Sequence, residues 1–195
     1  MKKGQQAMTE VKAAAATRAV RAQAQTRQMV QCAMLTALLA VCSQISIPLP
    51  MVPINLALFA VYLGAFLLDR RYALLSVGLY LMLGAVGLPV FAGFQGGPAA
   101  LFGKTGGYLL GYLCTAAVVT VMRPWADTFV KRCLICALGL LGCYVPGTLW
   151  FMLVTRLSLP VSLGYCVYPF LPGDAVKIAL AALLVPKLQG ALQLI

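Results

Sequence analysis

The chain has 195 residues, of which 62% are hydrophobic and 10% are charged, and its mean hydropathy is +0.93. A composition this apolar excludes a soluble domain and indicates a polytopic helical membrane protein. The formal charge of +11 comes from 15 basic and 4 acidic residues. The basic residues are spread along the chain as topology signals and do not form one basic surface, so we exclude nucleic-acid binding.

Residues 1–28 form a polar, alanine-rich and basic segment. No short apolar region with a cleavage site precedes the first full apolar segment, so we expect a cytoplasmic tail and not a removed leader. Its composition also suits a helix that lies along the membrane surface. We therefore divide the chain into a basic tail, 1–28, and a transmembrane substrate-binding domain, 29–195. The cations of the tail are Lys2, Lys3, Lys12, Arg18, Arg21 and Arg27.

Six apolar segments follow the tail, which predicts an all-α membrane protein built as a compact bundle of six transmembrane helices. The second and third segments are short for a bilayer, so one of them is expected to tilt or to span incompletely. Pro48–Pro53 separates the first segment from the second. The segments run over residues 29–47, 54–68, 73–88, 105–122, 133–154 and 173–194.

The distribution of the cations predicts which side of the membrane each loop faces. With the N-terminus in the cytoplasm, twelve of the fifteen Lys and Arg residues fall on the cytoplasmic side, as the positive-inside rule requires. Both termini are then cytoplasmic. The three cations left on the outer side, which need a separate explanation, are Lys104, Arg156 and Lys177.

A glycine-rich stretch, residues 87–98, joins the third apolar segment to the fourth. Irregular backbone at membrane depth is tolerated where it is buried in protein or lines a cavity, so this stretch is predicted to be a lid or a pocket wall. Just after it, Gly103, Gly107 and Gly111 recur every four residues. That spacing favours close approach of another helix.

Asp174 is the one acid predicted to lie at the outer side, and it precedes Lys177 by three residues. The two side chains would share a helix face. An ionisable pair at a membrane helix is costly unless it is used, which suggests a binding site. A helix-start acid favoured by the dipole and paired locally with the lysine explains the pattern equally well. The residues alone leave both interpretations open.

Small residues recur on one face of the first span, at Ala33, Ala37 and Ala40. They suit either packing inside the bundle or docking of a partner membrane protein. The chain has seven cysteines and no histidine. We interpret the cysteines as packing residues and expect no metal, no cofactor and no catalytic residue. Aromatic residues cluster near the predicted outer side: Phe91, Phe94, Tyr108, Tyr165, Tyr168 and Phe170. They suit a belt at the membrane interface, packing in the core, or the cover of a flat apolar ligand.

Four motifs carry a resemblance that covers nearly the whole chain after the tail: Ile45–Ile54, Tyr80–Gly93, Gly103–Tyr108 and Phe170–Lys177. In this order the chain resembles the BioY family, the biotin-binding S components of energy-coupling factor (ECF) vitamin transporters. The resemblance implies a six-helix bundle in the bacterial cytoplasmic membrane, among lipids, that binds biotin from outside. It also implies a transmembrane coupling subunit and two ATPase subunits as partners.

The resemblance further implies which residues bind the substrate. Asp174 and Lys177 belong to the ligand site, and the loop from Phe91 to Gly97 with Tyr108 forms another wall. Asn55 or Gln95 would complement the ureido group, and Lys177, Lys104 or Arg156 would hold the carboxylate. The expected substrate-binding set is Asp174, Lys177, Phe91, Phe94, Gln95, Tyr108, Asn55, Tyr165, Lys104 and Arg156, and the expected docking face is Ala33, Ala37 and Ala40.

Three positions depart from the family pattern. Lys104 stands where the family commonly has proline, and Asn55 and Ala57 stand where it often has threonine and glutamine. Two other hypotheses therefore accompany biotin uptake. One is an S component for a different small vitamin, and the other is an assembly protein whose Asp174–Lys177 pair is only structural.

Overall fold

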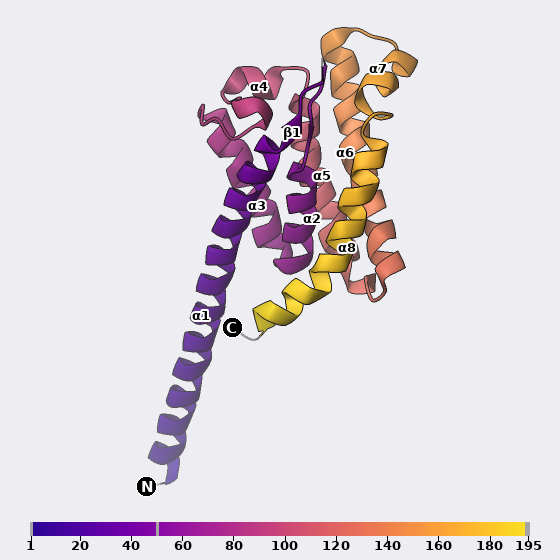
Figure 1. Cartoon of the computed structure of the whole chain (residues 1–195). Helices are drawn as coiled ribbons and strands as arrows, with labels where there is room; N and C mark the ends of the chain where they lie inside the picture. Colours follow the sequence, from indigo (N-terminus) through magenta and orange to yellow (C-terminus); the bar gives the residue numbers. More distant parts are fainter. Residues whose placement is uncertain (1, 50, 194–195) are drawn as a thin grey trace.

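The computed structural model describes residues 2–49 and 51–193, with the side chains of residues 18, 21–49 and 51–192. It is a bundle of roughly parallel and antiparallel helices (Figure 1). The longer helices are α1 (Lys2–Gln44), α2 (Ala57–Leu67), α3 (Arg70–Ala85), α5 (Gly106–Met122), α6 (Phe129–Thr155) and α8 (Leu171–Gln193). The shorter elements are β1 (Ser46–Ile47), β2 (Ile54–Asn55), η1 (Ala92–Phe94), α4 (Pro98–Phe102), η2 (Arg123–Trp125) and α7 (Leu159–Cys166).

Each predicted apolar segment overlaps one of the longer helices. Within the part of the chain that the structure describes, three helical stretches are long and apolar enough to cross a membrane: Gly106–Trp125, Phe129–Thr155 and Leu171–Leu192. The chain is thus mostly helical and fits an all-α membrane protein. The number of crossings and the side on which the termini lie stay predictions.

Two connections are more regular than the sequence predicts. The residues on either side of the proline-rich break after the first segment pair as the two short antiparallel strands of a hairpin, in which Ser46 pairs with Asn55. The connection between the last two segments contains α7. In addition, α8 begins at Leu171, three residues before the helix start expected at Asp174. Pro172 does not delay the helix, because proline is tolerated in the first turn, where its missing N–H has no partner to lose.

Helix α1 is continuous across residue 28, where composition changes from polar to apolar. Its 43 residues correspond to roughly 65 Å at about 1.5 Å per residue. That is about twice the thickness of a bilayer's hydrocarbon core. The N-terminal half accordingly extends well beyond the other helices (Figure 1). The basic tail is therefore helical, and the boundary at residue 28 is one of composition.

Helix α2 lies at the centre of the bundle. Nine of its eleven residues are buried, and it contacts α1, α3, α5 and α8. A helix that is apolar all round is stable where neighbours cover every side, which explains the lack of a polar face in this segment.

Helices α5 and α6 pack most closely. A Cβ atom at Gly107 would lie 2.2 Å from Trp150 Cβ, and one at Gly111 would lie 2.9 Å from the carbonyl oxygen of Cys143. The close approach predicted from the glycine spacing is confirmed at these two positions. Gly103 instead precedes α5, and its carbonyl accepts a hydrogen bond from Trp150 Nε1 at 3.0 Å.

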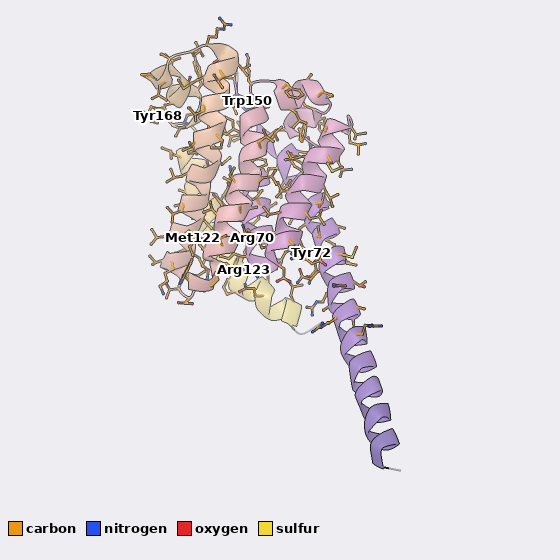
Figure 2. All side chains as sticks on the ribbon, turned by 180° about the vertical axis from the view of Figure 1, so that it is seen from behind. Arg70, Tyr72, Met122, Arg123, Trp150 and Tyr168 are labelled. Atoms are coloured by element: carbon orange, nitrogen blue, oxygen red, sulfur yellow. The ribbon has the colours of Figure 1, made fainter. Side chains whose placement is uncertain are left out.

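The lateral surface is apolar, with exposed large side chains on several helices, among them Met34, Leu75, Leu141, Leu153 and Leu183. Such a surface suits lipid and not water. Arg70 and Arg123 lie at one end of the bundle, whereas Trp150 and Tyr168 lie toward the other (Figure 2). The protein thus has an apolar belt between two ends. One end is basic, and the end opposite to it carries the site described next.

Candidate functional site

A cavity of about 70 Å³ lies between the hairpin, the glycine-rich loop and helices α2, α5, α6 and α8. Its walls combine aromatic and aliphatic side chains with a few polar groups, the usual composition of a small-molecule site. The lining residues are Val52, Pro53, Asn55, Leu58, Phe91, Ala92, Gln95, Thr105, Tyr108, Leu109, Tyr112, Cys143, Tyr144, Phe170, Asp174 and Lys177.

A buried ion pair forms the polar centre of this cavity. Asp174 is 2% exposed and Lys177 is 6% exposed. Lys177 Nζ lies 2.7 Å from Asp174 Oδ1, and the Tyr144 hydroxyl donates to Oδ2 of the same carboxylate. The first turn of α8 places the acid where the helix dipole favours negative charge. Because a carboxylate has about four lone-pair sites, Asp174 can still accept hydrogen bonds from a ligand.

Asn55 supplies the second polar group. Its Oδ1 accepts from the backbone N–H of Ala57 at 3.1 Å and from the Tyr112 hydroxyl at 3.3 Å. These two donors fix the orientation of the amide, so its NH2 group is left to donate toward the cavity. The side chain of Ala57 is fully buried in the core and does not line the cavity.

Aromatic packing fixes the loop wall. The Phe91 ring is buried and meets the Tyr80 ring edge-on, with centroids 5.3 Å apart and an interplanar angle of 75°. It lies directly against Gly84, where a Cβ atom would be 2.0 Å from the ring. On the opposite wall the Tyr108 hydroxyl shares a hydrogen bond of 2.9 Å with Thr148 Oγ1.

Six of the ten predicted substrate-binding residues line the cavity: Asp174, Lys177, Phe91, Gln95, Tyr108 and Asn55. The structure does not bring the other four to it. Phe94 is 72% exposed, and Tyr165 is an exposed residue of α7. Arg156 is an exposed residue that caps the end of α6. The Nζ atom of Lys104 lies 3.6 Å from the sulfur of Met51. The binding role of all ten stays a prediction.

Sequence reasoning missed Tyr144, Tyr112 and Thr105. Both tyrosines sit inside long apolar helices, where aromatic residues are commonly core, so nothing in the sequence distinguishes them. Thr105 directly precedes α5, and its position at the start of a helix was the available signal.

A larger cavity of about 740 Å³ lies at the basic end and is lined in part by Arg27, Asp69, Arg123 and Arg132. Arg123 donates to the carbonyl of Leu68 and lies 3.4 Å from Asp69 Oδ1. Arg132 donates to three backbone carbonyls. Because these two guanidinium groups hold loops together, we take the smaller cavity, with its buried ion pair, as the candidate site.

The predicted docking face lies on α1. Ala33 and Ala37 are exposed and Ala40 is half-buried, so the two outer alanines do not pack inside this chain. The face is open to a partner.

The sequence matches the family model described as the BioY family over residues 11–194. A protein of Thermotoga maritima named Biotin transporter BioY is 38% identical over 166 residues, which cover 84% of this chain and 96% of that protein. A probable biotin transporter BioY of Pyrococcus horikoshii is 36% identical over 158 residues, covering 81% and 93%. The crystal structure of the S-component for biotin from an ECF-type ABC transporter superposes with a TM-score of 0.80 at 26% identity, covering 86% of this chain and 93% of that one.

Proposed function

The chain belongs to the BioY family, and on that premise we propose that it is the biotin-binding S component of an ECF-type transporter. It is a multi-pass membrane protein, not an enzyme, and it takes up a vitamin. The observation that carries the assignment is the buried pair of Asp174 and Lys177 in a mostly apolar cavity.

The chemistry of biotin matches this cavity group by group. Its ureido ring offers two N–H donors and one carbonyl acceptor. Asp174 accepts from the ureido N–H groups, and the NH2 group of Asn55 donates to the ureido oxygen. Lys177, with two donors not used by the ion pair, reinforces the same end of the ligand.

The apolar part of biotin, a sulfur-containing ring with an alkyl chain, requires walls without hydrogen-bonding groups. Leu58, Leu109, Phe91 and Phe170 supply such walls. Burying these walls against the ligand makes the binding free energy more favourable by about 25 cal/mol for each Å² of apolar surface removed from water. The polar groups fix the orientation, and the apolar walls supply affinity that an ion pair alone does not give.

We propose that the helices cross a bacterial plasma membrane six times, with both termini and the tail 1–28 in the cytoplasm. The gathering of Arg70 and Arg123 at one end of the bundle supports this orientation. The cavity then opens to the outside, so the protein captures biotin before it crosses the lipid bilayer.

The partners follow from the same assignment. An S component has no energy source of its own, so we propose that a transmembrane coupling subunit and two ATPase subunits drive release. The alanine face of α1 is the proposed docking surface, because small exposed residues let a partner helix approach closely.

Calorimetry on the detergent-solubilised protein tests the substrate. Biotin, thiamine, riboflavin and pantothenate are titrated in turn into the same preparation. Tight binding of biotin alone supports the proposal. Tight binding of another vitamin with none of biotin would reassign the substrate, and the departures at Asn55 and Lys104 would then be its first explanation.

A further inference from the structure

The cavity beside Asp174 is smaller than a ligand site has to be. Its volume is about 70 Å³, whereas pockets for small organic ligands start at about 300 Å³. A ligand therefore enters only after part of the wall moves outward. The core holds the helical walls, and it also holds Val52 of the hairpin and Phe91 of the glycine-rich loop, whereas the side chains of residues 92–95 are not buried. What holds these residues decides how the cavity opens.

The side chain of Gln44, the last residue of α1, holds the loop by three hydrogen bonds. Its Nε2 donates to the carbonyls of Pro89 at 3.2 Å and Phe91 at 3.0 Å, and its Oε1 accepts from the backbone N–H of Phe94 at 3.0 Å. One orientation of the amide satisfies all three partners, because the flipped amide would turn its oxygen toward two carbonyls. The preceding residue, Ser43, donates to the carbonyl of Val90.

The backbone that Gln44 holds is strained. Phe94 has φ of 56° and Gly93 has φ of 70°. A side chain in this left-handed region is uncommon and raises the energy of the loop. The Phe94 ring is 72% exposed, so its own packing does not hold it there. The buried Phe91 ring anchors one end of this loop. The bridge between Phe91 and Gln95 and the bond from Phe94 to Gln44 keep the turn itself in this shape.

We propose that Gln44 is a positioning residue that clamps residues 91–95 over the cavity and thereby sets the rate at which the ligand leaves. The inference rests on the proposed function, in that the cavity at Asp174 is taken as the biotin site. When Gln44 releases its three partners, the strained turn relaxes and moves Ala92 and Gln95 away from the cavity, while Phe91 stays anchored in the core.

The test compares Gln44→Met with a matched variant in the middle of the same helix. Gln28 also binds a loop by its side chain, because its Oε1 accepts from the backbone N–H of Asp69 at 3.3 Å. Methionine keeps the length of the side chain and removes both the donors and the acceptor. Each purified protein is loaded with tritiated biotin, diluted into excess unlabelled biotin, and filtered over time.

We expect biotin to leave Gln44→Met about ten- to a hundredfold faster than wild type, the effect of losing two or three hydrogen bonds. Gln28→Met is expected to release biotin at the wild-type rate, and a cooperative thermal unfolding transition shows that each variant is folded. A folded Gln44→Met protein that releases biotin at the wild-type rate would overturn the clamp.

Hydrogen exchange on the ligand-free wild-type protein tests the clamp without any variant and without biotin. The amide of Phe94 is expected to be protected, although its residue is exposed, and Gln44→Met is expected to lose that protection. Free exchange at Phe94 in wild type would overturn the inference. Absence of biotin binding by a protein that shows this protection would instead overturn the proposed function and leave the clamp standing.

Discussion

Replacing Asp174 by asparagine tests the site most directly. The carboxylate is 2% exposed, it lies 2.7 Å from Lys177 Nζ, and it accepts from Tyr144. Removing one partner of a buried, hydrogen-bonded charge pair at a binding site costs about 2–5 kcal/mol of binding. At about 1.4 kcal/mol per factor of ten, the Kd for biotin rises about 30- to 4,000-fold. Calorimetry with purified protein measures this change.

The same substitution leaves the ammonium of Lys177 buried without a counter-charge, which lowers the stability by about 3–5 kcal/mol. The double variant Asp174→Asn, Lys177→Met removes both charges and is expected to recover most of that loss while still binding biotin weakly. Asp127→Asn is the control, because it breaks an exposed pair with Lys131. If the folded double variant bound biotin as tightly as wild type, the pair would be only a helix-start ion pair, and our reasoning about the site would be wrong.

Three further outcomes are expected. Tyr144→Phe keeps the ring but removes the hydroxyl that donates to the buried carboxylate. Calorimetry is therefore expected to give a Kd for biotin about tenfold higher. An unchanged Kd would remove this tyrosine from the site. Gly111→Ala places a Cβ atom 2.9 Å from a carbonyl oxygen of α6, so thermal unfolding in detergent is expected at a lower temperature. Gly78→Ala, with no atom within 4 Å of the added carbon, is not expected to unfold earlier, and equal effects would refute the packing argument. Ala37→Leu fills the exposed face of α1, so uptake by cells that also express the ECF subunits is expected to fall while binding by the isolated protein stays unchanged.

The positions of the helices follow from the sequence because apolar runs of this length have few other stable forms. The hairpin after α1 was not predicted, since each strand has only two residues and no alternating pattern to reveal it. Helix α7 was also missed. Its eight residues include Pro160 and Gly164, which in sequence indicate a loop.

The site was predicted in part. The spacing of Asp174 and Lys177 placed both on one face of one helix, and their pairing is local, so sequence alone suggested it. Tyr144 of α6 contacts this pair on α8, although it lies 30 residues from Asp174 in the sequence. Such contacts depend on how helices rotate against each other, and the sequence carries no signal for that rotation. Phe94 illustrates the converse, because its positive φ turns it outward while its neighbour Gln95 lines the cavity.

We propose that the charge balance of the cavity decides where the carboxylate of biotin binds. Asp174 and Lys177 together are neutral, so a carboxylate beside Lys177 would also meet the negative charge of Asp174. The uncharged ureido ring suits that end, and the carboxylate then lies toward Thr105, next to the exposed cation Lys104. Because an exposed ion pair contributes little, Lys104→Gln is expected to weaken binding of biotin by no more than about fivefold, with less effect at high salt. Biotin amide, which lacks the charge, is expected to bind wild type and Lys104→Gln equally; an equal loss for both ligands would show that Lys104 does not act through the carboxylate.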